Sequence, residues 1–428
     1  MPPTDTRYRI RVRMTPRAID EPHRVSSPLE LLFDLTFVVA VAAATGQFAH
    51  DVIDGHALAG LAPFLQVFFA VWWAWMNFTW FASSYDTDDV AYRLLTMVQM
   101  GGVLVLAAGV PAAADRSDYG AVTLGYIIMR SALVAQWLRA GVEDSAGRRT
   151  ALRYAGGISV LQAGWILRLV LAETGNLPSP AQVPSFIGLA VLELAVPRWA
   201  ERTTPTNWHP HHIAERYGLF TLIIFGESVL ATSNGVDRAL EAAELSGPLV
   251  IIAVSGLVLL FALWWLYFLP PAGEGLGDRR HRSYLWGYGH YGIFASLAAL
   301  GAGLKVAVEQ TGHDLNATPL AVCYAVAIPA ATFVISHWLV HTPLFAEPVI
   351  HPAAALSAAT AVLLLPLAAP RTGVAAVIAA IAGVCALMTA VTILPKAGRT
   401  RFHKISPVGP RRSAGEHYNP DRFNGTGV

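Results

Sequence analysis

Long apolar stretches separated by short polar breaks follow one another along the chain. A membrane-spanning helix needs about 20 mostly apolar residues, and the sequence contains twelve stretches of that kind. They cover residues 28–47, 57–82, 94–114, 120–140, 154–172, 181–197, 213–233, 248–269, 287–308, 319–341, 352–369 and 373–394. This pattern predicts an all-α transmembrane helix bundle of about twelve spans. The last two stretches are separated only by the short break at 369–373, so residues 352–394 could form one span or two.

The positive charges are distributed unevenly between the two sides of such a bundle. With the N-terminus inside, the inner segments hold 24 of the 30 Lys and Arg residues, and the outer loops hold 3. The inner count includes Arg216, and the cations left inside apolar stretches are Arg130, Arg168 and Lys305. Cytoplasmic loops of membrane proteins are enriched in Lys and Arg. We therefore expect a multi-pass protein of the inner membrane with both termini in the cytoplasm.

Several features recur at matching places in the two halves of the chain. The matching features are Trp72-Trp73 with Trp264-Trp265, Glu30 with Glu215, and Gln136-Trp137 with His337-Trp338. These matches predict two six-helix repeats, residues 28–200 and 210–395, in the same orientation because each contains an even number of spans. Flexible basic tails are expected at 1–27 and 396–428. Alternatively, the Trp pairs are interfacial residues that recur by chance.

Three segments carry a resemblance to a known family. They are Pro-Leu-Glu-Leu-Leu-Phe-Asp-Leu-Thr-Phe-Val at 28–38, His-Ile-Ala-Glu-Arg-Tyr-Gly-Leu-Phe-Thr-Leu-Ile-Ile-Phe-Gly-Glu-Ser at 212–228, and Trp-Trp-Leu-Tyr-Phe at 264–268. Together they resemble the bacterial low temperature requirement A family of integral membrane proteins. The resemblance implies a polytopic inner-membrane protein linked by name to growth in the cold, and it implies no reaction or substrate. One departure is His-Pro-His-His at 209–212, where the family has a single His.

Two carboxylates stand near the start of the first apolar stretch. Glu30 and Asp34 are four residues apart, which places them on one face of a helix. Charged side chains inside a membrane are costly and usually face the interior of the bundle. This pair could bind a cation or share a proton. Alternatively, Glu30 only marks the start of the helix, where the helix dipole favours acids.

The seventh apolar stretch carries a second group of ionisable residues. His212 and Glu215 are three residues apart and share a helix face, and the repeat would bring Glu215 to the same depth as Glu30. Glu227 lies about 18 Å further along the helix, at ~1.5 Å per residue. Its candidate partners by depth are Arg168, Arg130 and Lys305. The alternative is a purely structural ion pair.

Histidines offer weaker signals. The run at 209–212 matches no established zinc signature, so we expect no metal ion and no cofactor. His290 lies within the ninth stretch, where it could relay protons or simply form a hydrogen bond in the core. The candidate substrate- or ion-binding residues are Glu30, Asp34, His212, Glu215, Glu227, His290, Arg130 and Arg168.

Composition narrows the function further. Charged residues make up 14% of the chain, against roughly 25% in soluble domains. The net charge of +1 excludes a basic face for nucleic acids, and the Walker A, HExxH and GxSxG motifs do not occur in the sequence. We expect a transporter-like protein with intramembrane carboxylates as proton or cation sites, in contact with membrane lipids and a small-molecule or ion substrate. The alternatives are a lipid-modifying membrane enzyme and a structural or stress-adaptation protein.

Overall fold

A computed structural model describes residues 10–19, 21–22, 24–241 and 246–394. Every regular element in these residues is a helix. The α-helices are α1 (Pro28–Ile53), α2 (Ala57–Tyr85), α3 (Val90–Ala108), α4 (Val110–Arg116), α5 (Gly120–Glu143), α6 (Arg148–Glu173), α7 (Ser179–Ala200), α8 (Pro210–Glu241), α9 (Gly247–Phe268), α10 (Ala272–Asp278), α11 (Ser283–Glu309), α12 (Pro319–His341), α13 (Pro352–Leu364), α14 (Ala369–Thr372) and α15 (Val374–Ile393). Short 3-10 turns lie at Arg280–Arg282, Thr342–Leu344 and Leu365–Ala368.

The predicted helical bundle is confirmed. Within the described ranges, eleven helical segments are long and apolar enough to cross a membrane. They include Pro352–Thr372 and Val374–Ile393 as separate segments, so the last two stretches form two candidate spans. Gly373 divides them with a φ of 81°, a left-handed conformation that suits glycine. The remaining long helix, α8, covers the seventh stretch and carries Glu215 and Glu227.

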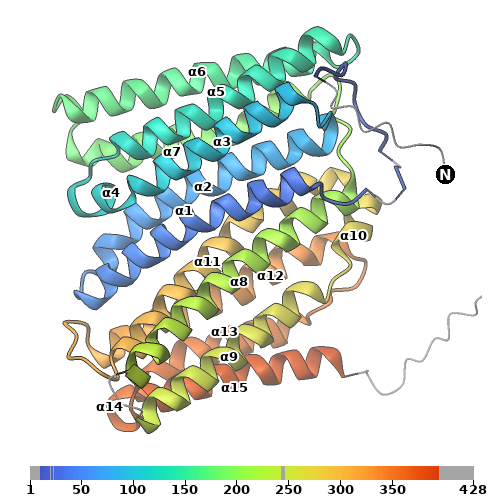
Figure 1. Ribbon diagram of the computed structural model, residues 1–428. Coiled ribbons are helices and arrows are strands. Elements are labelled where there is room, and N and C mark those ends of the chain that lie inside the picture. The colour runs from blue at the N-terminus through green and yellow to red at the C-terminus, as the bar shows by residue number, and fades with distance from the viewer. Residues whose placement is uncertain (1–9, 20, 23, 242–245, 395–428) are drawn as a thin grey trace, which may run out of the picture. The chain divides into compact units, whose positions relative to one another are not determined.

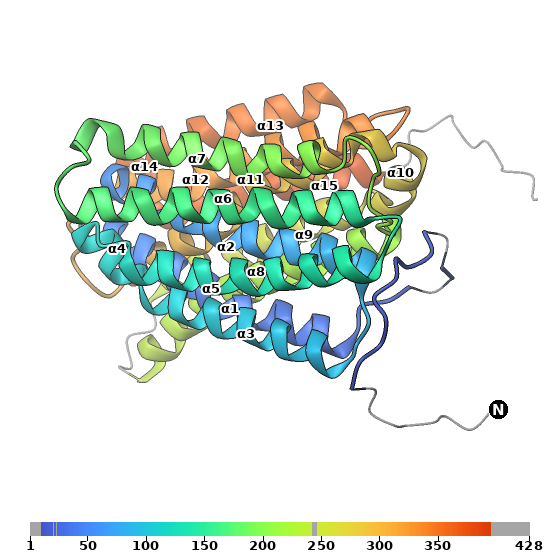
Figure 2. The same ribbon diagram turned by 90° about the horizontal axis from the view of Figure 1, so that it is seen from above.

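Two groups of helices lie side by side within residues 10–392. In Figure 1, α1–α7 (blue to green) occupy one side and α8–α15 (green to red) occupy the other. Figure 2 shows the same helices from above, with their axes running in similar directions. The groups meet where α1 and α2 pack against α8 and α11. Residues from these four helices are therefore placed to form contacts between the two groups.

Packing distinguishes the two tryptophan pairs on which the predicted repeat partly rests. Trp72 and Trp73 of α2 are buried in the aromatic core, with 1% and 0% of their surface exposed. Trp264 and Trp265 of α9 are 41% and 51% exposed. The pairs therefore occupy different environments, and the repeat of 28–200 at 210–395 stays a prediction.

Residues 10–19 of the N-terminal segment are anchored, although we expected a flexible tail at 1–27. The backbone N–H of Met14 donates to Glu143 Oε2 at 2.6 Å, and that of Val12 donates to Asp89 Oδ2 at 2.7 Å. The side chain of Met14 is fully buried. Residues 10–19 therefore pack across the helix ends near α3 and α5. The predicted C-terminal tail, 396–428, lies outside the described residues.

Candidate functional site

A fully buried arginine lies at the contact between α1 and α8. Arg216 donates to Asp34 through two nitrogens, Nε to Oδ2 at 2.8 Å and Nη2 to Oδ1 at 2.6 Å. Its Nη1 donates to Glu30 Oε1 at 2.9 Å. All three side chains are at most 2% exposed. The predicted carboxylate pair therefore shares one face of α1, and both acids bind the same guanidinium.

This arrangement corrects the assignment of Arg216 to an inner loop. The residue lies within α8, almost two turns past Pro210, and none of its surface is exposed. A fork of guanidinium N–H groups matches carboxylate oxygens well, so two acids spaced by one helical turn can hold it. Arg216 is the central residue of the site, and it was not among the predicted candidates.

Local sequence explains how α1 presents Glu30. Ser27 is the N-cap of α1, and its Oγ accepts from the Glu30 backbone N–H at 3.3 Å. Glu30 Oε2 accepts in turn from the Ser27 backbone N–H at 2.8 Å, which completes a capping box. Pro28 occupies the first turn, where its missing N–H costs nothing. Glu30 therefore caps the helix and also binds Arg216, and its role as a proton or cation site stays a prediction.

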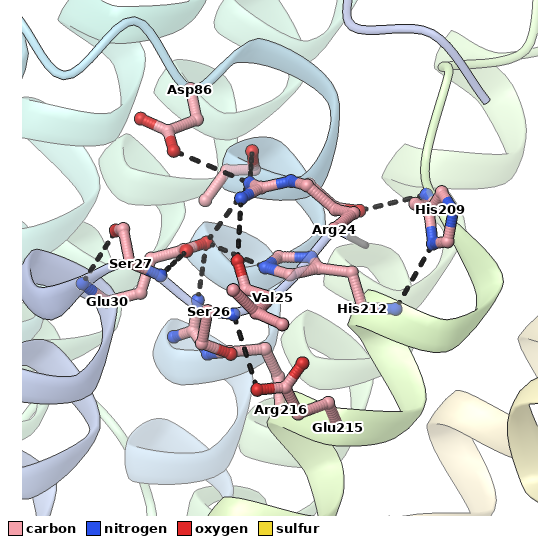
Figure 3. Close-up of polar contacts among 12 residues, drawn as sticks. Arg24, Val25, Ser26, Ser27, Glu30, Asp86, His209, His212, Glu215 and Arg216 are labelled. Carbon is pink, nitrogen blue, oxygen red and sulfur yellow. Dashed lines mark hydrogen bonds and ion pairs between the residues drawn. The ribbon is translucent and has the colours of Figure 1, made fainter. Parts of the chain in front are cut away.

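Further polar groups surround the two acids, and Figure 3 shows those near Glu30. Trp75 Nε1 of α2 donates to Asp34 Oδ1 at 2.7 Å. His212 Nε2 lies 3.1 Å from Glu30 Oε1, and Arg24 Nη2 lies 3.7 Å from the same oxygen. We call Arg24, Glu30, Asp34, Trp75, His212 and Arg216 the Arg216 network. It joins α1 and α2 of one helix group to α8 of the other.

Asp86 lies at the edge of the Arg216 network, just past the end of α2. Its Oδ2 is 3.5 Å from Arg24 Nη2 and 3.5 Å from Arg17 Nη1. Burial raises the pKa of Asp86 to about 6, with a further contribution from the negative charge of Glu30, although Arg24 and Arg17 lower it. Asp86 lies outside the membrane-spanning segments, and its raised pKa brings its titration closer to neutral pH.

Glu215 lies beside the network and lines a cavity. Its Oε1 accepts from the Ser26 backbone N–H at 3.3 Å, next to the Ser27 amide that binds Glu30. The cavity has a volume of about 320 Å³ and is also lined by Tyr267 and His341. His212 and Glu215 thus both face the start of α1 (Figure 3).

Glu193 forms a second buried polar cluster, which sequence reasoning missed. Arg130 Nη2 and Trp73 Nε1 donate to its Oε2 at 2.8 and 3.0 Å. Its Oε1 accepts from Tyr126, Gln162 and Trp165 at 3.1–3.2 Å. The only signal was a lone acid in the apolar stretch 181–197. Arg130 thus pairs with Glu193 and not with Glu227, which corrects one of the proposed pairings.

Glu227 is half-buried on α8, and the cation that acts on it electrostatically is Lys305 of α11. Arg168 bonds elsewhere, with Nε donating to Ser185 Oγ at 3.2 Å and Nη2 to the Gln182 carbonyl at 3.0 Å. Of the three predicted partners, only Lys305 therefore acts on Glu227. Glu227 lies apart from the Arg216 network.

His290 is a hydrogen-bonded core histidine. Its Nδ1 is 2.7 Å from the Trp286 carbonyl oxygen and its Nε2 is 3.1 Å from Tyr267 Oη. The rings of His337 and His341 stack nearby, with centroids 4.2 Å apart. Among the described residues, no group of three or more His, Cys, Asp or Glu side chains is arranged to hold a metal ion.

The helical segments, the apolar surface and the buried charges define a polytopic α-helical membrane protein. The chain belongs to a family described as "Bacterial low temperature requirement A protein", whose profile matches residues 25–393. It is also similar to "Uncharacterized protein RA0937" from Rhizobium meliloti (strain 1021), with 26% identity over 292 residues. That match covers 63% of this chain and 66% of the relative's length.

Proposed function

We propose that the protein is a secondary transporter-like membrane protein in which protonation or cation binding at Glu30 and Asp34 competes with Arg216. The observation that carries this proposal is the buried contact of both acids with Arg216 between the two helix groups. Ionisable residues inside a membrane are costly and commonly mark ion pathways. A network that joins two helix groups is suited to couple ion binding to their relative movement.

The contacts of Arg216 suggest how a ligand could compete with it. Arg216 binds both Glu30 and Asp34 at hydrogen-bond distance. His212 and Arg24 are the remaining basic groups close to Glu30, and Arg24 also lies 3.5 Å from Asp86. A proton or cation on either carboxylate competes with Arg216 for that carboxylate and weakens the hold of Arg216 on α1. Protonation therefore favours separation of α1 from α8.

Proton movement tests this role directly. The purified full chain is reconstituted in liposomes loaded with the pH-sensitive dye pyranine, and gradients of K⁺ or Na⁺ are applied. We expect proton movement faster than in empty liposomes, and at least about tenfold slower movement with Asp34→Asn. Asp118→Asn is the matched control, because Asp118 is an exposed acid before α5.

Two outcomes would contradict the proposal. In the first, vesicles with the natural chain move protons no faster than empty vesicles under either gradient. In the second, Asp34→Asn reconstitutes to equal abundance and retains full proton movement. A loss of folded protein without a change in proton movement per molecule would instead indicate a structural role for these charges.

We also propose an inner-membrane location with both termini in the cytoplasm. Its support is the distribution of Lys and Arg, 24 predicted in inner segments, or 23 once Arg216 is placed within α8, against 3 in outer loops. A green fluorescent protein fused to the C-terminus should then fluoresce in cells. Alkaline phosphatase inserted at 312–316, between α11 and α12, should be active, and the reverse result would contradict this topology.

A further inference from the structure

A small cavity lined by aromatic side chains lies where the two helix groups meet. Its volume is about 40 Å³, which holds roughly three water molecules. Its aromatic lining consists of Trp80, Trp137, Trp208, Tyr154, Tyr284 and Tyr288. These residues come from α2, α5, α6, α11 and the segment before α8. Both helix groups therefore contribute to the walls.

Three of the six rings are buried, and the other three are partly buried. Trp137, Tyr154 and Trp208 are 3%, 7% and 5% exposed. Trp137 and Tyr154 stack in parallel with ring centroids 4.2 Å apart, and Trp80 meets Trp208 edge-on at 4.9 Å. Aromatic residues of an interfacial belt would instead contact headgroups. The aromatic rings therefore pack against one another along one side of the cavity.

Glu201 adds a negatively charged side chain to the lining of the cavity. Its Oε1 accepts from Tyr154 Oη at 2.9 Å and from Thr206 Oγ1 at 2.6 Å, and its Oε2 accepts from Tyr284 Oη at 2.9 Å. These three donors are neutral hydroxyl groups that orient the carboxylate without cancelling its charge, and Arg280 is a cation of the chain that also interacts with it. The carboxylate therefore attracts a cation toward the rings.

One ring of the cluster already binds a cation within the chain. The Arg280 guanidinium carbon lies 3.8 Å from the centroid of the Trp208 ring, and Arg280 Nη2 donates to the Trp208 carbonyl at 3.0 Å. The negative face of an aromatic ring attracts cations, and Trp does so most strongly. Aromatic cages with a nearby carboxylate are well suited to alkylammonium groups.

We propose that this cavity binds the ammonium group of a small organic cation. The aromatic faces supply cation–π attraction, and Glu201 supplies the opposite charge. The inference goes beyond the proton coupling proposed above, because the cavity shares no lining residue with the Arg216 network. Binding can be measured without any ion flux, so either proposal can fail while the other stands.

Binding is tested with the full chain in nanodiscs of phosphatidylglycerol, which lacks an ammonium headgroup. Choline is titrated against its neutral isostere 3,3-dimethylbutan-1-ol, and binding is followed by calorimetry and tryptophan fluorescence. We expect saturable choline binding at least about tenfold tighter than binding of the alcohol. Equal binding of the two probes, or no saturable binding of choline, would overturn the proposal.

Variants of the lining residues test whether choline binds in this cavity. Glu201→Gln and Trp208→Leu are each expected to weaken choline binding by about tenfold. Glu173→Gln is the matched control, because Glu173 is an exposed acid at the other end of α6 from Tyr154. Tyr284→Phe keeps the ring and removes one hydroxyl, so it should retain choline binding even if Glu201→Gln fails to fold. Unchanged affinity in folded Glu201→Gln, or loss of affinity in Glu173→Gln, would contradict the assignment.

A last experiment distinguishes a lipid headgroup from a free organic cation as the source of the ammonium group. In nanodiscs that contain phosphatidylcholine, a site for lipid headgroups should bind added choline more weakly because the headgroup competes. A site for a free cation should bind choline equally in both kinds of nanodisc. Both results support recognition of an ammonium group, and they differ in the molecule that carries it.

Discussion

Replacing Arg216 by methionine should strongly destabilise the contact between α1 and α8. The change removes three charge-assisted hydrogen bonds of 2.6–2.9 Å and leaves two buried carboxylates without their main counter-ion. Asp34 then retains only the Trp75 N–H among the contacts described above. Removing one partner of a buried ion pair costs about 3–5 kcal/mol. At roughly 2 °C per kcal/mol for a large chain, the Tm should fall by about 6–10 °C.

The assay is thermal unfolding of the purified chain in detergent at pH 7, followed by tryptophan fluorescence. Arg93→Met is the matched control, because Arg93 pairs with Asp88 at 2.7 Å on the surface and such pairs contribute about 0–1 kcal/mol. The triple variant Glu30→Gln, Asp34→Asn, Arg216→Met removes all three charges together. We expect it to recover most of the lost stability, because it leaves no unpaired charge buried.

The reasoning is refuted if Arg216→Met behaves like Arg93→Met. It is also refuted if the triple variant is no more stable than Arg216→Met, because the penalty would then come from lost packing and not from uncompensated charge.

Three further outcomes follow from the structure. Glu193→Leu should lower the free energy of unfolding by about 3 kcal/mol or more, because it leaves Arg130 buried without its counter-ion. Glu227→Gln, at a half-buried site, should lower it by less than about 1 kcal/mol. Thermal unfolding in detergent compares the two variants. The pKa of Asp86 is raised in the folded chain to about 6, so its contribution to stability is fully present below about pH 4 and is lost as the pH rises through about 6. The Tm should therefore fall between pH 4 and 8, and Asp86→Asn should remove this slope. An unchanged slope in Asp86→Asn would contradict the assignment. Ser27→Ala should cost about 1 kcal/mol because it removes the N-cap of α1, and Ser27→Asp, which keeps a capping oxygen, should restore the Tm.

The hydrophobic pattern predicted the helices well, because a membrane span must satisfy its backbone hydrogen bonds within one apolar stretch. The spacing of Glu30 and Asp34 likewise predicted a shared face, since one helical turn separates them. Arg216 was missed because a cation near the end of an apolar stretch is hard to distinguish from an inner-loop cation. Its role depends on a contact with α1, which no local spacing encodes.

The Glu193 cluster was hidden for a related reason. Its donors come from α2, α5 and α6, while Glu193 itself lies on α7. A single acid in an apolar stretch gives no indication of which helices will surround it. Similarly, the Trp264-Trp265 pair looks like Trp72-Trp73 in sequence, and only packing reveals that one pair is exposed and the other is buried.

The contact between α1 and α8 also constrains how the chain is made. Asp34 is synthesised 182 residues before Arg216, its counter-ion in the finished molecule. At about 5–20 residues per second, this interval lasts roughly 10–40 s. Throughout that time the first helix carries two acids without their main counter-ion, and charges are costly inside a membrane. The contact that holds these two acids between the helix groups can therefore form only after α8 has left the ribosome.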